Sequence, residues 1–121
     1  MYDDVAPGPG ARASILNTGA LRVRPVSRKA FADSAVFASM GGRLRGVAIR
    51  ESTGAAACAF RLYDGADNAG QLVLPIAAGA GGFASIYFAD DGVDIEHALF
   101  VDLVSGAADV TIFYQFDTGS L

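Results

Sequence analysis

The sequence predicts an all-β domain: an antiparallel β-sandwich of the jelly-roll or immunoglobulin-like kind with an extended N-terminal arm. From residue 35 onward, short apolar runs alternate with turns that contain Gly or Asp, which is the pattern of a sandwich or barrel. Apolar residues repeat with period two inside these runs, and no stretch shows a sustained helical stripe with caps. The chain has 121 residues, of which 52% are hydrophobic, enough for the core of one domain.

Residues 1–34 are predicted to form the extended arm. The run from Pro7 to Gly10 alternates Pro and Gly, so it cannot continue a helix or a central strand. Leu21–Arg24 alternates apolar and basic residues, and a short edge strand that ends at Pro25 is an alternative there. Residues 28–32 fit either an extended segment or a single helical turn.

Residues 35–121 are predicted to form the sandwich. The expected strands cover seven ranges: 35–40, 43–51, 57–63, 71–77, 83–89, 97–104 and 109–116. One face of each of the last two strands is expected in the core, namely Leu99, Val101, Leu103, Val110, Ile112 and Tyr114. The opposite faces are only partly polar, and we expect a partner chain or the arm to cover Phe100, Phe113 and Tyr63.

Charge is distributed unevenly along the chain. Residues 1–61 hold all nine basic residues and four acidic ones, a net charge of 9 − 4 = +5, whereas residues 62–121 hold nine acidic residues and no Lys or Arg, a net charge of −9. Such asymmetry suggests charge-complementary association. The alternative is that the two halves interleave in the fold and the charges mix.

The densest basic cluster is the predicted partner-binding site. It consists of Arg22, Arg24, Arg28 and Lys29, with Phe31 nearby. The net charge of −4 and the pI of about 4.7 argue against a dedicated nucleic-acid binder. We therefore expect this basic arm to dock onto an acidic protein surface.

The sequence offers no catalytic, cofactor-binding or metal-binding residues to assign, and we expect a protein that is not an enzyme and uses no cofactor. Cys58 stands in an apolar stretch and is expected to be a small core residue. His97 is the single histidine and reads as a strand-edge residue. The acidic run Asp90–Glu96 is expected to be a solvated turn, although carboxylates also suit Ca²⁺, and that question stays open.

Residues 68–89 carry no charge and are long enough to raise the question of a membrane span. They contain Gly70, Gly79, Gly81 and Gly82 as well as Pro75. A strand, a turn and a second strand fit this pattern better, so we expect no contact with a membrane.

Several strand-and-turn segments resemble a known family. They are Leu44–Gly54, Ala59–Gly65, Gly70–Ile76, His97–Gly106 and Asp109–Tyr114. The stretch from Leu44 to Phe116 is similar to small β-sandwich virion proteins of tailed bacteriophages, especially those that infect actinobacterial hosts with GC-rich genomes.

The resemblance implies a non-enzymatic structural protein of the virion. It would be a capsid decoration, or cement, protein that binds the phage head. Its partner would be the major capsid protein or another virion protein, and it would form a homo-oligomer, with a trimer as one candidate. The alternatives are a carbohydrate- or receptor-binding β-sandwich module and a head–tail connector or tail component. The family pattern supplies no active-site residues.

Overall fold

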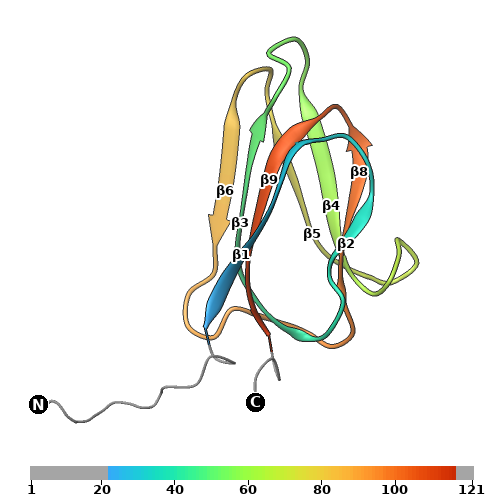
Figure 1. Ribbon diagram of the computed structural model, residues 1–121, viewed down its shortest axis with the longest axis vertical. Helices are drawn as coiled ribbons and strands as arrows, with labels where there is room; N and C mark the ends of the chain where they lie inside the picture. Colours follow the sequence, from blue (N-terminus) through green and yellow to red (C-terminus); the bar gives the residue numbers. More distant parts are fainter. Residues whose placement is uncertain (1–21, 117–121) are drawn as a thin grey trace, which may run out of the picture.

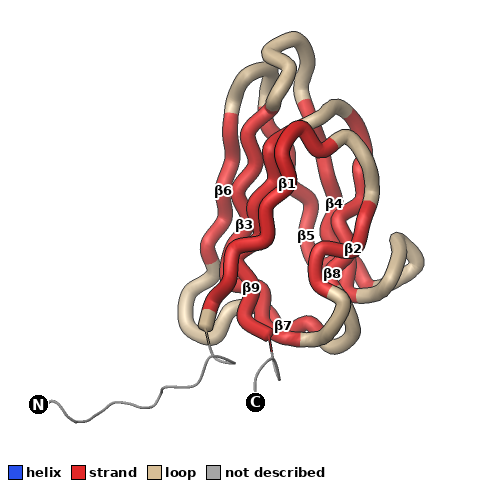
Figure 2. Tube along the Cα trace, in the orientation of Figure 1, coloured by secondary structure: helices blue, strands red, loops and turns tan. Residues whose placement is uncertain are grey.

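The computed structural model describes residues 22–116 and shows two antiparallel sheets packed face to face (Figure 1). Sheet A has the order β1 (Val23–Phe31), β9 (Ala108–Phe116), β3 (Gly42–Glu51) and β6 (Phe83–Tyr87), with the short β7 (Val93–Ile95) also beside β3. Sheet B has the order β2 (Ala35–Ala38), β8 (Leu99–Ser105), β4 (Cys58–Asp64) and β5 (Gln71–Ala78). The described chain contains strands and loops only (Figure 2). The predicted all-β sandwich is therefore confirmed.

The strand pairing selects the jelly roll from the two predicted alternatives. β1 pairs with β9, β2 with β8, β3 with β6 and β4 with β5. The first half of the chain thus runs antiparallel to the second half, as one long hairpin that is folded over into two sheets. This is the arrangement of an eight-stranded jelly roll, with β7 as a small addition.

The predicted boundary between arm and sandwich at residue 34 is wrong. Residues 23–31 form β1, a full strand of sheet A whose register runs from Val23 opposite Gln115 to Arg28 opposite Val110. Pro25 does not end the strand, because β1 lies at the edge of the sheet, where a residue without an N–H group is tolerated. The predicted arm at residues 1–21 lies outside the described residues.

β1 ends by delivering an aromatic side chain to the core. The register shifts between Arg28 and Phe31, and Ala30 adopts a φ of 47° there. This bulge turns Phe31 inward, where its ring contacts Phe37 edge-on at 5.2 Å and stacks on Phe60 at 5.9 Å between centroids. The local irregularity therefore fixes the position of β1 on the sandwich.

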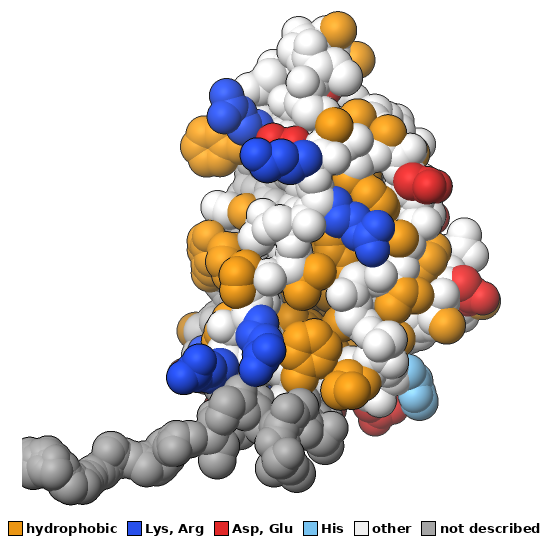
Figure 3. Space-filling model, in the orientation of Figure 1, with side chains coloured by type: hydrophobic (Ala, Val, Ile, Leu, Met, Phe, Trp, Pro, Cys, Tyr) orange, Lys and Arg blue, Asp and Glu red, His pale blue; other side chains and the backbone are white. Residues whose placement is uncertain are grey.

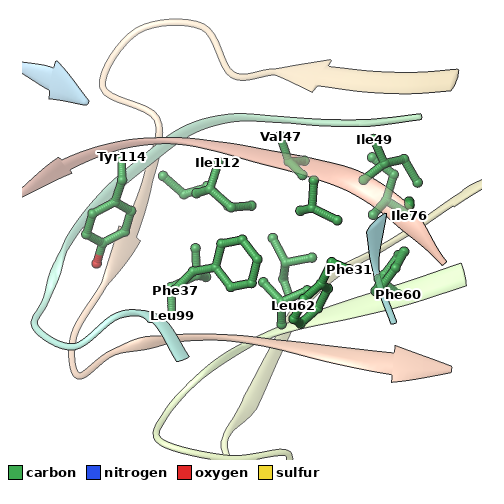
Figure 4. Packing of buried hydrophobic residues seen from close by; sticks show 14 of the residues in the cluster. Phe31, Phe37, Val47, Ile49, Phe60, Leu62, Ile76, Leu99, Ile112 and Tyr114 are labelled. Atoms are coloured by element: carbon green, nitrogen blue, oxygen red, sulfur yellow. The ribbon is translucent and has the colours of Figure 1, made fainter. Parts of the chain in front are cut away.

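The core lies between the two sheets and is lined by the inward faces of the strands (Figure 4). Alternation places Val110, Ile112 and Tyr114 of β9 inward, all at most 1% exposed. Leu99 and Val101 of β8 are fully buried, and Leu103 is half-buried. The predicted core faces of these two strands are therefore confirmed.

The uncharged stretch at residues 68–89 contributes two strands from different sheets. β5 and β6 are joined by the turn at Gly79–Gly82, where Gly82 donates its N–H to the carbonyl of Gly79. Among residues 22–116, no helix is long and apolar enough to cross a membrane.

The two oppositely charged halves of the chain interleave. β9, from the acidic half, lies between β1 and β3, which both come from the basic half. The alternative that charges mix within the fold is therefore correct for sheet A, and the halves do not form separate lobes.

The buried face of β8 provides the first prediction. Val101→Asp places a carboxylate at a position that is 0% exposed, so the free energy of unfolding should fall by more than about 3 kcal/mol. Val104→Asp is the matched control, because Val104 lies on the same strand and is 49% exposed. Urea denaturation should show a lower free energy of unfolding for Val101→Asp only. Equal losses for the two variants would mean that the inward face of β8 has been assigned incorrectly.

Candidate partner-binding surface

One of the five predicted contact residues is buried in the core. Arg22, Arg24, Arg28 and Lys29 are exposed, whereas Phe31 is 6% exposed and belongs to the core. Arg24 and Arg28 stand opposite Tyr114 and Val110 in the register, so they point toward the rim between the two sheets. Phe31 must therefore be removed from the predicted contact set.

Arg28 covers the core at the open side of the sandwich. Its guanidinium lies 5.0 Å from the ring centroid of Phe37 and 5.9 Å from that of Phe31. A guanidinium over aromatic faces contributes about 0.5–1 kcal/mol at an exposed site. Arg28 therefore has a role in the fold that its place in a basic cluster did not reveal.

Most basic side chains of the described chain lie on sheet A. Its strands carry six of them, Arg24, Arg28, Lys29, Arg43, Arg45 and Arg50, whereas the strands of sheet B carry Arg61. Among residues 22–116, no Arg or Lys lies within ion-pair distance of a carboxylate. Figure 3 shows most Lys and Arg side chains at the left and centre of the molecule, and acidic side chains mostly toward the right, where the strands of sheet B lie.

The outer face of sheet A also carries an aromatic pair. Pro25, Phe113, Gly46 and Tyr87 are neighbours across four strands, and the rings of Tyr87 and Phe113 lie 5.6 Å apart between centroids. Gly46 makes this possible, since a Cβ atom there would stand 2.6 Å from Cδ1 of Tyr87. The phenol ring therefore lies directly against the backbone of β3.

The outer face of sheet B carries a second apolar row. Its members are cross-strand neighbours on β2, β8, β4 and β5: Val36, Phe100, Tyr63 and Leu72. Phe100 and Tyr63 are half-buried, as is Phe113 on sheet A. A shallow, mostly apolar pocket on sheet B is lined by residues that include Ala59, Arg61, Pro75, Ala77 and Val104. The described chain thus presents apolar side chains on both outer faces.

The acidic turns have structural partners. Asp64 accepts hydrogen bonds from the backbone amides of Glu96 and His97, at 2.8 and 2.9 Å, and so fastens the turn before β8. His97 is exposed in that turn, 3.8 Å from Glu96. Within residues 22–116, no three His, Cys, Asp or Glu side chains come together as metal ligands. The acidic run at residues 90–96 forms turns around β7.

Cys58 begins β4 and is 1% exposed. Desolvation by burial raises the pKa of its thiol, which lowers the fraction of nucleophilic thiolate at neutral pH. The prediction of a small core residue is therefore confirmed.

Glu51 is a buried carboxylate that the sequence pattern did not single out. It is 3% exposed, and its oxygens accept hydrogen bonds from the Thr53 hydroxyl at 2.6 Å and from the amides of Thr53, Gly54 and Gly81 at 2.6–2.9 Å. The Thr53 hydroxyl, followed by these amides, lowers the pKa of Glu51 from 4.5 to about 2. The side chain joins the turn after β3 to the turn before β6.

Comparisons with protein families, curated proteins and solved structures find no match for this chain.

The Glu51 interaction gives a prediction about pH. Because its pKa is lowered by folding, Glu51 contributes stability above pH 4.5, and that contribution is lost as the pH falls toward 2. Glu51→Gln should therefore lower the melting temperature by several degrees at pH 7, and the gap to the native chain should close on acidification. Glu96→Gln is the control, because the Glu96 side chain is 74% exposed. A gap that stays constant from pH 7 to pH 2 would contradict the assignment.

Proposed function

We propose that this chain is a non-enzymatic structural protein of a virion, a capsid decoration protein that binds the head of a tailed phage. Its partner is the major capsid protein or another virion protein, and it acts as a homo-oligomer. The same resemblance that suggested this role remains its starting point.

The observation that carries the proposal is the jelly-roll pairing of the strands. Pairing of β1 with β9, β2 with β8, β3 with β6 and β4 with β5 gives an architecture that recurs in viral capsid proteins and in lectins. Because a fold hosts many functions, the attachment surface has to supply the rest of the argument.

Sheet A supplies the attachment surface that we propose. Arg43 and Arg50 stand on the outer face of β3, beside Gln115 and Asp109 in the register. Neither forms an ion pair within residues 22–116, and a guanidinium binds carboxylates through two parallel hydrogen bonds. The half-buried Phe113 and the exposed Val23 add apolar area, which is needed because surface ion pairs contribute only about 0–1 kcal/mol each.

The segment that can serve as an attachment arm is shorter than the predicted residues 1–34, because β1 belongs to the sandwich. Deletion of residues 1–34 would remove β1 and take Phe31 out of the core, so an attachment role within this range belongs to residues 1–21 and to the exposed side of β1. Arg22, Arg24 and Lys29 are the cluster members that best keep such a role. All three are exposed, and the contact with the core aromatics is made by Arg28.

A carbohydrate- or receptor-binding module is the second candidate, and one observation favours it. Tyr87, which is 64% exposed, pairs with Phe113 on the outer face of sheet A, and flat sugar faces pack on exposed aromatic rings. Binding to a glycan array that is lost in Tyr87→Ala would favour this candidate over capsid decoration.

The test of capsid attachment is co-sedimentation with shells assembled from the major capsid protein of the same virus. The double variant Arg43→Gln/Arg50→Gln should bind roughly tenfold more weakly, because two ion pairs of up to about 1 kcal/mol each are lost. Added salt should weaken binding by the native chain partially, since screening leaves apolar contacts intact.

Arg61→Gln is the control on the other sheet, because it removes one Arg charge from the outer side of sheet B. It should bind shells like the native chain. An equal loss for Arg61→Gln would move the attachment surface away from sheet A, and a native chain that never co-sediments would refute capsid decoration.

A further inference from the structure

The four edges of the sandwich are not equally protected against pairing with another strand. β1 carries Arg24, Arg28 and Lys29 together with Pro25, β5 carries Pro75, and β2 is only four residues long with a register shift. Charges, proline and short length are the usual devices that protect an edge. β6 carries neither a charged residue nor a proline, because its residues are Phe83, Ala84, Ser85, Ile86 and Tyr87.

In β6, the backbone N–H and C=O groups of every second residue point toward the open edge of the sheet. Phe88 donates its N–H to the carbonyl of Arg45, and Glu51 donates to that of Gly82, so residues 82 and 88 face β3. Because the direction alternates along a strand, Ala84 and Ile86 also face β3. The N–H and C=O groups of Phe83, Ser85 and Tyr87 therefore face away from it, and among the described residues β6 has no strand on that side (Figure 1).

We propose that β6 is a homodimerisation edge that pairs antiparallel with β6 of a second copy of this chain, with Ser85 on the two-fold axis. In this register Ser85 stands opposite its own counterpart, and Phe83 stands opposite Tyr87 of the second copy. All three pairs are of the hydrogen-bonded kind, because the backbone groups of these residues point to the edge. The two copies of sheet A then form one continuous sheet.

The side chains of this edge complement themselves. Phe83 is 78% and Tyr87 64% exposed, and both stand on the outer face, opposite Arg50 and Gly46 of β3. Two-fold pairing places the Phe83 ring of each copy beside the Tyr87 ring of the other, as a cross-strand aromatic pair. Figure 3 shows hydrophobic side chains along the left side of the molecule, where Figure 1 places β6.

Charge also favours a second copy as the occupant. Antiparallel pairing brings the end of β6 that lies beside Arg50 to the end of the second strand, which the exposed Asp90 and Asp91 follow. Arg50 of each copy therefore lies at the same end of the interface as Asp90 and Asp91 of the other copy, and no charged residue lies within the paired strands.

The expected dimer is weak. Four aromatic side chains that bury about 150 Å² each cover roughly 600 Å², about half of the roughly 1,200 Å² at the lower limit of a standard interface. Association should therefore depend on concentration. The pairing does not depend on attachment to a capsid.

Sedimentation velocity of the full chain from roughly 1 µM to 1 mM tests the proposal. The native chain should change from monomer to dimer in this range. Ser85→Lys and Ser85→Asp should each stay monomeric, because like charges would meet directly on the axis. An equimolar mixture of the two variants should dimerise again, since opposite charges would then face each other.

Ser27→Lys is the matched control, because Ser27 is an exposed residue on the outer face of the opposite edge strand, β1. It should dimerise like the native chain, and the melting temperatures of dilute Ser85 variants should match that of the native chain. The proposal is overturned by a native chain that stays monomeric, by Ser85 variants that associate as the native chain does, by a trimer, or by a mixture that stays monomeric.

Discussion

The pairing of β3 with β9 is the constraint on which the rest of the structure depends. It runs from Gly42 opposite Phe116 to Glu51 opposite Ala108 and joins segments from opposite halves of the chain. The inward faces of the two strands bring together Val47, Ile49 and Ile112, each at most 2% exposed. Residues 52–107 form the loop that this pairing closes, and closing it costs chain entropy. The burial of these inward faces offsets that cost. The other strands of sheet A are added to this pair: β1 pairs with β9, and β6 and β7 pair with β3.

The register of this pair determines what the outer surface offers. It sets Gly46 beside Phe113 and so opens the space that the Tyr87 ring fills, and it places Arg43 and Arg50 on the same face of β3. It also leaves β6 as the last strand of the sheet, with an uncharged outer edge. The proposed attachment face and the proposed dimer edge are therefore consequences of one alignment of two central strands.

The sequence was sufficient for the strands whose apolar residues alternate, namely β2 to β6, β8 and β9, because period two is a local property. It was insufficient at β1, where Pro25 suggested a stop, since whether a strand lies at an edge depends on its distant partner β9. The sequence did not predict β7, because a strand of three residues is too short to show a period-two pattern. The structural roles of Glu51 and Arg28 could not be predicted either, because their partners are distant in the sequence. Glu51 accepts a hydrogen bond from the amide of Gly81, and Arg28 lies over the ring of Phe37.

Amide hydrogen exchange at Ala48 and Thr111 tests the central role of β3 and β9 most directly. These two residues face each other at the middle of the pair, and their N–H groups bond across it if the alternation set by Ser52 and Ala107 continues. We predict that both amides exchange only through global unfolding, whereas the amide of Ser27, at the outer edge of β1, exchanges much faster. Exchange at Ala48 and Thr111 that is as fast as at Ser27 would contradict the account.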